Sequence, residues 1–372
     1  CTVGGGRSCC LTAHVVLDLR ADRGACLSCR PPTSSAVMNR FSSVQRRGSC
    51  GGAVRGARSA VMVRSAQSGE VTIRRYPPAG KDRQGCGKQL TFEVPSEEDE
   101  KPRNILEEIV WFKNDEIAKH RAKLDLAALK RKIQVTPPAR DFIGAIKAKY
   151  EETGKPGLIA ECKRASPSKG IIKEDFDPVD IALEYEAGGA ACISVLTDEK
   201  YFKGSFDNLE LIRSAGVSCP LLCKEFIIEA YQIFHARAKG ADAILLIAAV
   251  LPNSDLSYFI KCAKSLGMAA LVEVHSVAEM QRVLEVAELE LIGINNRDLE
   301  TFKVNLYNTA DLLDEDTKRR LAERDIICVG ESGIFTPEDV KVVQDAGCKA
   351  ILVGESLVKQ DDIEGAVKQI LS

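Results

Sequence analysis

The sequence predicts an α/β fold, a closed (β/α)8 TIM barrel that occupies the last two-thirds of the chain. Short apolar segments with the character of buried strands recur eight times from residue 158 onward, and helical segments separate them. Repeated βα units form parallel sheets, and eight of them in succession favour a closed barrel. A doubly wound open sheet is the alternative. It usually carries a G-x-G-x-x-G turn after its first strand, and this sequence has none.

Each expected element follows from hydrophobic spacing and from turn residues. Small residues end several helices and lead directly into a strand, as at 187–194, 239–246 and 346–353, where glycine permits the left-handed turn after a helix. The expected strands are 158–163, 191–196, 221–226, 243–248, 269–274, 290–295, 326–331 and 349–354. The expected helices between them are 178–187, 227–239, 256–266, 277–287, 306–322 and 337–346.

Extra N-terminal helices are expected ahead of the barrel. Apolar residues recur at three- and four-residue steps from Asn104 to Leu129, and a second short helix is expected at 142–150. We therefore interpret residues 102–150 as a helical extension of one barrel domain, 102–372, and expect these helices to cover one end of the barrel.

The first hundred residues differ in composition from the rest. Residues 1–69 hold ten Arg, ten Ser and no Lys, and their only acidic residues are Asp18 and Asp22. An Arg-rich, Ser-rich and acid-poor segment is typical of an organelle transit peptide, so we interpret residues 1–66 as a disordered transit peptide. A disordered basic tail that binds anions is the alternative. Residues 67–101 are polar, and we interpret them as a linker.

The overall composition argues against several classes of function. The chain has 372 residues, of which 45% are hydrophobic, and its net charge of −2 gives no reason to expect nucleic acid or a membrane surface as partner. The apolar run 243–251 is too short to span a membrane. The four His are scattered and Cys26 and Cys29 lack a second pair, so neither a metal nor another cofactor is expected. The later Cys lie mostly in strands and are expected to be free core thiols.

Charged side chains interrupt the apolar strands where these strands end. Glu161 and Lys163 are two residues apart, so both side chains point to the same side of the pleat. The carboxyl ends of all strands in a parallel barrel open onto one face, where the active sites of this fold lie. A salt bridge in the barrel would explain any one of these residues. Together they favour an active site, because buried charges are costly unless paired. The other members of the set are Lys224, Glu273, Asn295, Arg297, Glu331 and Ser332.

Two similar turns favour a phosphate site. The last two strands end in VGESG (329–333) and VGES (353–356). Glycine lets backbone N–H groups approach an anion, and the loops after strands seven and eight often hold phosphate in this fold. We interpret the basic loop at 163–170 as a lid over an anionic ligand, with a solvated turn as the alternative. These residues alone indicate an enzyme that acts on a phosphorylated small molecule, with Lys and Glu as acid and base.

Seven motifs, in this order, resemble the indole-3-glycerol-phosphate synthase family of tryptophan biosynthesis. They are IAECKRASPSKG (159–170), SVLTDEKYFKGS (194–205), LLCKEFI (221–227), LVEVH (271–275), IGINNRDLETF (292–302), VGESGI (329–334) and LVGESL (352–357). The resemblance covers about residues 102–372 and includes the leading segment ILEEIVWFKNDEIA (105–118). Plant members of this family carry a plastid transit peptide, so the resemblance implies a location in the chloroplast stroma.

The resemblance implies conversion of 1-(2-carboxyphenylamino)-1-deoxyribulose 5-phosphate to indole-3-glycerol phosphate, with loss of CO2 and water. It implies that Lys224 is the general acid for the ribulose carbonyl, with burial and neighbouring cations lowering its pKa toward the working pH. Lys163, paired with Glu161, would hold the substrate carboxylate, and Glu273 would act in the dehydration. Phe202 and Phe226 would form apolar walls for the aromatic ring. The remaining implied substrate-binding residues are Ser166, Asn295, Arg297, Leu299, Glu331 and Ser332, and the implied phosphate-binding residues are Ser332, Gly333, Gly354 and Glu355.

Three other interpretations remain open. Phosphoribosylanthranilate isomerase is a barrel of the same pathway, but it uses a Cys and an Asp where this mouth offers Lys and Glu. A Schiff-base aldolase would use Lys224 as nucleophile, and borohydride would trap its adduct. Outside the enzymes, the chain would be a phosphate-ligand-binding barrel that serves as a pathway scaffold. The expected partners are a phosphorylated small molecule and, through the pathway, the α subunit of tryptophan synthase.

Overall fold

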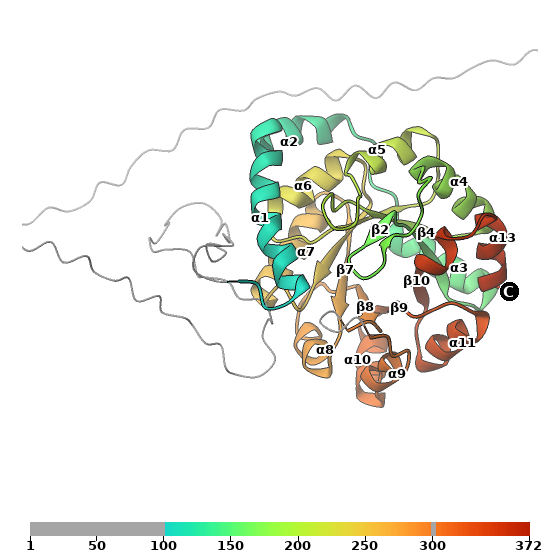
Figure 1. Ribbon diagram of the computed structural model, residues 1–372. Coiled ribbons are helices and arrows are strands. Elements are labelled where there is room, and N and C mark those ends of the chain that lie inside the picture. Colours follow the sequence, from blue (N-terminus) through green and yellow to red (C-terminus); the bar gives the residue numbers. More distant parts are fainter. Residues whose placement is uncertain (1–100, 299–302) are drawn as a thin grey trace, which may run out of the picture. The chain divides into compact units, whose positions relative to one another are not determined.

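The computed structural model describes residues 101–298 and 303–372, and within them a closed barrel is the central feature (Figure 1). Its eight parallel strands pair in the order β1-β10-β9-β8-β7-β6-β5-β4. The predicted fold class is therefore confirmed. The segments interpreted as transit peptide and linker lie outside the described residues, except for Lys101.

The strands lie within two residues of their predicted bounds. They are β1 (Gly157–Cys162), β4 (Cys192–Leu196), β5 (Leu221–Lys224), β6 (Ala243–Ile247), β7 (Ala269–Val274), β8 (Leu291–Asn295), β9 (Ile327–Glu331) and β10 (Ala350–Val353). Helices cover the outside of the barrel and side chains fill its inside, so nearly all strand residues are buried. This burial explains why the strands are continuous apolar runs in the sequence.

The helices surround the barrel (Figure 1). They are α4 (Pro178–Gly188), α5 (Asp207–Ser214), α6 (Ala230–Ala238), α7 (Asn253–Ser265), α8 (Val277–Val283), α9 (Asn308–Leu312), α10 (Glu315–Glu323), α11 (Pro337–Ala346), α12 (Glu355–Val358) and α13 (Ile363–Ile370). The sequence set no bounds for α5, α12 or α13, although a helix was expected after the last strand. The single helix expected at 306–322 is wrong, because the Asp314 side chain accepts a hydrogen bond from the Thr317 N–H and starts α10 there. The left-handed turns after α4 and α11 are confirmed at Gly189 (φ 101°) and Gly347 (φ 120°).

Three helices precede the barrel: α1 (Ile105–Lys123), α2 (Leu126–Val135) and α3 (Phe142–Thr153). The continuous helix expected up to Leu129 is interrupted because Asp125 caps the start of α2. α3 packs against β1 and β4, and the Cys192 thiol lies 3.6 Å from the Phe142 carbonyl oxygen. Ile105 and Ile109 of α1, in contrast, line the pocket at the carboxyl ends of the strands. The expectation that these helices cover only one end is therefore wrong.

The loop after β1 forms a short antiparallel hairpin, β2 (Ala165–Ser166) with β3 (Gly170–Ile171). Its closure over a ligand stays a prediction. Two other expectations concern the described residues as a whole. None of the helices described is both long and apolar enough to cross a bilayer. The seven cysteines between Cys162 and Cys348 are free thiols and six of them are buried, as predicted for core residues.

Candidate active site

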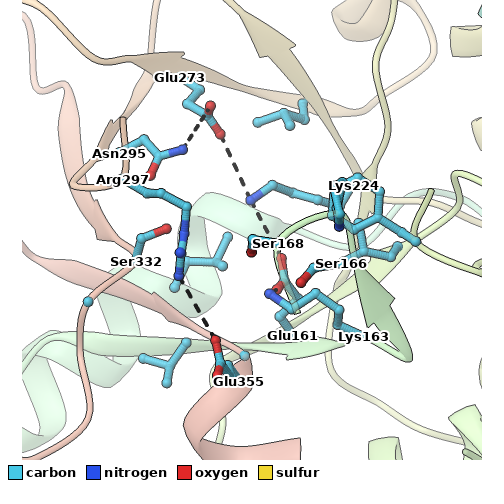
Figure 2. A pocket seen from close by; sticks show the side chains of 18 of the residues that line it. Glu161, Lys163, Ser166, Ser168, Lys224, Glu273, Asn295, Arg297, Ser332 and Glu355 are labelled. Atoms are coloured by element: carbon cyan, nitrogen blue, oxygen red, sulfur yellow. Dashed lines mark hydrogen bonds and ion pairs between the residues drawn. The ribbon is translucent and has the colours of Figure 1, made fainter. Parts of the chain in front are cut away.

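A pocket of about 170 Å³ opens at the carboxyl ends of the barrel strands. Every strand of the barrel contributes a lining residue, either from its last residues or from the position directly after it. Figure 2 shows Glu161 and Glu273 approaching Lys224 from different strands, while Arg297 and Glu355 pair with each other in another part of the pocket. The polar residues that interrupt the apolar strands therefore share one site, because parallel strands of a barrel end on one face.

Lys224, the last residue of β5, holds the centre of this group. Its Nζ donates a hydrogen bond to Glu331 Oε2 at 3.0 Å. The same Nζ lies 3.6 Å from Glu161 Oε1 and 4.0 Å from Glu273 Oε2. The Lys224 side chain is 13% exposed, so this ammonium group still reaches the pocket.

The charge state of Lys224 differs from the sequence-based expectation. Burial lowers the pKa of this ammonium group, but the charges of Glu331, Glu161 and Glu273 outweigh burial and hold the pKa well above its ordinary value. The expectation that neighbouring cations lower the pKa is wrong, because the charges that dominate around Lys224 are carboxylates. Lys224 is therefore protonated at neutral pH.

Glu331 lies beneath Lys224 and is 1% exposed. Burial is the largest influence and raises the pKa of Glu331 to about 7, although the charge of Lys224 acts in the opposite direction. Its Oε1 has no hydrogen-bond partner among the described residues. Space for this oxygen comes from Gly293 of β8, where a Cβ atom would collide with Glu331 Oε1. Glu331 is thus a buried carboxyl group that can exchange a proton near neutral pH.

Glu161 connects the two lysines of the pocket. Its Oε2 accepts a hydrogen bond from Lys163 Nζ at 2.5 Å, and its Oε1 faces Lys224. Burial alone would raise the pKa of Glu161, but the charges of Lys163 and Lys224 outweigh it and lower the pKa. A Cβ atom at Gly354 would collide with Glu161 Oε2, so this glycine makes room for the carboxylate. Glu161 therefore stays ionised and holds both ammonium groups in place.

A chain of polar contacts follows β7 and β8. Asn295 Nδ2 donates to Glu273 Oε1 at 3.2 Å, and Asn295 Oδ1 accepts from the Arg297 backbone N–H at 3.0 Å. The Arg297 guanidinium lies 4.0 Å from Glu355 Oε2, as Figure 2 shows. Glu355 also pairs with Lys359 at 2.5 Å. Asn295 thus fixes the orientation of Glu273, and Arg297 provides a cation on the same side of the pocket as Glu355.

Aromatic and aliphatic side chains line another part of the pocket. The rings of Phe202 and Phe226 lie with centroids 5.9 Å apart. Ile105, Leu106 and Ile109 of α1 line the same pocket. The sequence analysis did not assign these three α1 residues to the site. Their apolar spacing at the start of the helix is a signal of a buried face, but it does not tell which surface covers that face.

The turn after β9 has an unusual backbone. Ser332 and Gly333 have positive φ values of 64° and 78°, and positive φ is uncommon for a residue other than glycine. Gly354 and Glu355 follow β10 and line the pocket together with this turn. These are the residues that the sequence suggested for phosphate binding, and backbone N–H groups of such turns are suited to an anion.

The structure brings the expected site residues together with two exceptions. Glu331 contacts Lys224 from below and does not line the pocket itself. Leu299 lies outside the described residues. The pocket thus combines a central ammonium group among carboxylates, an apolar wall with two aromatic rings, and glycine-containing turns that suit a phosphate group.

Comparison with known proteins agrees with this arrangement. The family model described as indole-3-glycerol phosphate synthase matches residues 106–370. The chloroplastic indole-3-glycerol phosphate synthase of Arabidopsis thaliana is 54% identical over 297 residues, which cover 80% of this chain and 74% of that protein. The indole-3-glycerol phosphate synthase of Crocosphaera subtropica is 55% identical over 285 residues, or 76% of this chain and 94% of that protein. That of Microcystis aeruginosa is 58% identical over 261 residues, or 70% and 86% of the two chains. The chain therefore belongs to the indole-3-glycerol phosphate synthase family.

Proposed function

We propose that this protein converts 1-(2-carboxyphenylamino)-1-deoxyribulose 5-phosphate to indole-3-glycerol phosphate, with loss of CO2 and water. Membership of the family supports this reaction. The single observation that carries it is the position of the Lys224 ammonium group, which lies among three carboxylates and reaches a pocket with an aromatic wall. Such a pocket offers an acid at its centre and an apolar surface for an aryl ring.

The first step is carbon–carbon bond formation. The ring carbon that bears the carboxylate attacks the ribulose carbonyl carbon, and the carbonyl oxygen takes a proton from Lys224 Nζ. Loss of CO2 then returns the electrons of its bond to the ring and restores aromaticity. Lys163 and Arg297 are the cations that line the pocket beside Lys224, and they hold the anionic groups of the substrate.

A high pKa for Lys224 is compatible with this role. The oxygen that develops negative charge during bond formation is an alkoxide, which is a stronger base than an amine, so the proton moves downhill. Glu331 lies 3.0 Å from Lys224 Nζ and has a pKa of about 7, so it can return a proton to the neutral amine. Glu331 therefore supplies the proton that restores the Lys224 ammonium group.

The second stage is dehydration. The hydroxyl group formed in the first step must leave as water, which requires one acid and one base on the carbon skeleton. Glu273 lines the pocket, and Asn295 orients it through a hydrogen bond of 3.2 Å. Glu273 takes the proton that is lost from the carbon skeleton, while Lys224 or Lys163 supplies the proton to the leaving hydroxyl.

The competing reactions are less well supported. A Schiff base requires a neutral lysine amine, whereas the three carboxylates around Lys224, outweighing its burial, raise its pKa and keep it protonated. A scaffold without catalysis is not favoured, because the relatives are named as synthases and the polar groups of the pocket are all in place.

The direct test is turnover by the purified protein. Indole formation from the carboxyphenylamino-deoxyribulose phosphate is followed by the change in absorbance, and CO2 release is measured in parallel. Equal rates of the two are expected. Release of CO2 without indole would show that the protein only decarboxylates the substrate. No turnover by a folded protein that binds the substrate would support the interpretation as a scaffold without catalysis.

We also propose that residues 1–66 direct the chain to the chloroplast stroma. Their Arg-rich and acid-poor composition supports this, and the relative from Arabidopsis thaliana is named chloroplastic. Fusion of residues 1–66 to a fluorescent protein should give plastid fluorescence, and diffuse fluorescence would contradict the proposal. A contact with the tryptophan synthase α subunit is a separate proposal, for which co-purification of the two proteins is the test.

A further inference from the structure

A second lysine surrounded by three carboxylates lies beside the pocket. Lys113 of α1 is 2% exposed, and its Nζ lies 2.7 Å from Asp198 Oδ2, 2.9 Å from Glu225 Oε1 and 2.5 Å from Glu116 Oε2. Asp198 and Glu225 are also almost fully buried. We call these four residues the Lys113 cluster. Lys113 does not line the pocket and has no part in the reaction steps above.

The Lys113 cluster holds the backbone that carries Phe202. Asp198 follows β4, and its Oδ1 accepts hydrogen bonds from the backbone N–H groups of Tyr201 at 2.7 Å and Phe202 at 3.1 Å. Its other oxygen, Oδ2, accepts from Lys113. Both carboxylate oxygens of Asp198 are therefore occupied, one by α1 and one by the turn that presents Phe202.

The same cluster holds the backbone that carries Phe226. Glu225 follows Lys224, and its Oε1 accepts from the Phe226 backbone N–H at 2.8 Å as well as facing Lys113. Its Oε2 accepts from the Thr197 hydroxyl at 2.7 Å. One buried ammonium group thus touches the two carboxylates that fix the start of both aromatic walls of the pocket.

The position of Lys113 on α1 links this support to the pocket itself. Ile105, Ile109 and Lys113 are spaced four residues apart, so they lie on one face of the helix. The first two line the pocket next to the aromatic rings, and Lys113 continues the same face into the cluster. A shift of α1 would therefore move the aliphatic and the aromatic parts of the wall together.

Lys113 stays charged across the physiological range of pH. Burial lowers the pKa of Lys113, but Glu225, Asp198 and Glu116 outweigh it and raise the pKa well above its ordinary value. The ammonium group therefore remains a fixed positive charge between two loops of the barrel.

We infer that Lys113 is a positioning residue for the aryl ring of the substrate, because it binds Asp198 and Glu225, which set the backbone of Phe202 and Phe226. This inference rests on the proposed function, in which these two rings form the wall for the aryl group. It adds a determinant of substrate affinity that lies on α1, ahead of the barrel strands and outside the reacting groups.

The test uses two isosteric changes that each remove one negative charge from the cluster. In Asp198→Asn, the single amide oxygen cannot accept from both Lys113 and the Phe202 loop, since the amide nitrogen is a donor. In Glu225→Gln, Oε1 can still accept from Phe226, and the amide nitrogen can donate to the Thr197 hydroxyl oxygen. Asp198→Asn should raise KM about tenfold with a smaller change in kcat, because misplacement of a substrate wall weakens binding. Glu225→Gln should leave KM within about twofold of the unchanged protein.

Inorganic phosphate is the probe that separates positioning from general damage. Its inhibition constant should be the same in both variants, because Ser332, Gly333 and Gly354 lie in the turns after β9 and β10, whereas Asp198 and Glu225 follow β4 and β5. Equal KM values for Asp198→Asn and the unchanged protein would overturn the inference. A rise in the inhibition constant that matches the rise in KM would overturn it too, as would equal effects of the two changes.

If Asp198→Asn does not fold, Glu225→Ala against Glu225→Gln decides the question. The alanine removes the acceptor of the Phe226 N–H and should raise KM, whereas the glutamine retains that acceptor. Equal KM values for these two variants would overturn the inference. Absence of turnover by the unchanged protein would instead refute the proposed function, and the inference with it.

Discussion

Two lysines of this molecule have almost the same electrostatic surroundings, yet only one of them reaches the pocket. Lys224 and Lys113 each face three carboxylates, and the raised pKa of each has the same cause. Around Lys113 the carboxylates also bind backbone N–H groups, a hydroxyl group or a histidine. One carboxylate oxygen in each cluster, Glu331 Oε1 and Glu116 Oε2, lacks a hydrogen bond to the described residues. The clusters differ in exposure, because the Lys224 side chain is 13% exposed and the Lys113 side chain is 2% exposed.

The comparison teaches that burial and charge alone do not identify a catalytic lysine. A closed cluster whose carboxylates also bind the backbone holds elements of the fold together, whereas a cluster that opens into a pocket can exchange protons with a ligand. Four predictions test this distinction, from the largest expected effect to the smallest.

Loss of Lys224 should abolish most of the activity and leave the fold intact. Lys224→Ala is expected to lower kcat about 10²–10⁴-fold, the usual effect of removing a general acid. Because the Lys224 cluster opens to the pocket, Glu331 can take up a proton when its counter-charge is lost. Stopped-flow or steady-state assays give kcat, and circular dichroism checks the fold. Turnover close to that of the unchanged protein would remove Lys224 from the mechanism.

Loss of Lys113 should chiefly lower the stability of the fold and raise KM, whereas loss of Lys224 lowers kcat. Lys113→Met leaves Asp198 and Glu225 buried without their cation, and breaking a buried ion pair in this way costs about 3–5 kcal/mol. Urea unfolding measures this loss. The control is Arg121→Met, which removes the ion pair between α1 and Glu229 at a position where Arg121 is 43% exposed, and which should cost less than about 1 kcal/mol. Equal stability of Lys113→Met and Arg121→Met would show that the Lys113 cluster does not stabilise the fold more than an exposed ion pair does.

A small change beneath Lys224 should disturb the acid without removing it. Gly293→Ala places a methyl group where Glu331 Oε1 lies, so the Glu331 carboxyl group must leave its present position beside Lys224. We expect kcat to fall about tenfold, since small displacements of catalytic groups reduce rates strongly. Gly157→Ala is the matched control in β1, because a Cβ atom there would have its nearest neighbour at 3.4 Å. An unchanged kcat in Gly293→Ala would show that the position of Glu331 does not matter.

The pH dependence of stability should reveal the proton on Glu331. Burial raises the pKa of Glu331 from 4.5 to about 7, so the folded protein binds this proton more tightly than the unfolded chain does. Its contribution to stability is therefore complete below pH 4.5 and is lost as the pH rises through 7. Glu331→Gln should not show this loss, so its stability relative to the unchanged protein should increase between these two pH values.

Glu355→Gln is the control for this measurement, and it should give the opposite slope. Burial tends to raise the pKa of Glu355, but Lys359 outweighs it and lowers the pKa. The contribution of Glu355 is therefore present above the ordinary carboxyl pKa and lost as the pH falls through the lowered value. Parallel pH profiles for Glu331→Gln and the unchanged protein would contradict the assigned proton.

The sequence predicted the barrel well, because the features that mark each strand and turn lie within a short segment of the chain. Strands buried on both faces are continuous apolar runs, and Gly189 and Gly347 mark the turns between helix and strand. Helix boundaries were less accurate, since one capping residue such as Asp125 or Asp314 ends a pattern that otherwise continues. α5 was missed because only Leu209 and Ile212 of that short helix are buried, which leaves a weak periodic signal.

The sequence predicted most of the polar residues at the pocket, but it did not predict their charge states. Polar residues at strand ends had to lie on one face of the barrel. The neighbours of Lys224 come from β1, β7 and β9, and no spacing along the sequence tells which of them lie within 4 Å of its ammonium group. The direction of the pKa shift of Lys224 could therefore not be predicted from the sequence. The partners of Lys113 lie 85 or more residues away along the chain, except for Glu116.

The pairing of β1 with β10 has a consequence for how the protein is made. Gly157 pairs with Ala350, and the Glu161 carboxylate occupies the space above Gly354, so an early part of the barrel is completed by the last of its eight strands. During synthesis the ribosome releases seven strands that cannot yet form a ring. The pocket is therefore incomplete until β10 and the turn at Gly354 have been added, because these close the barrel beside Glu161.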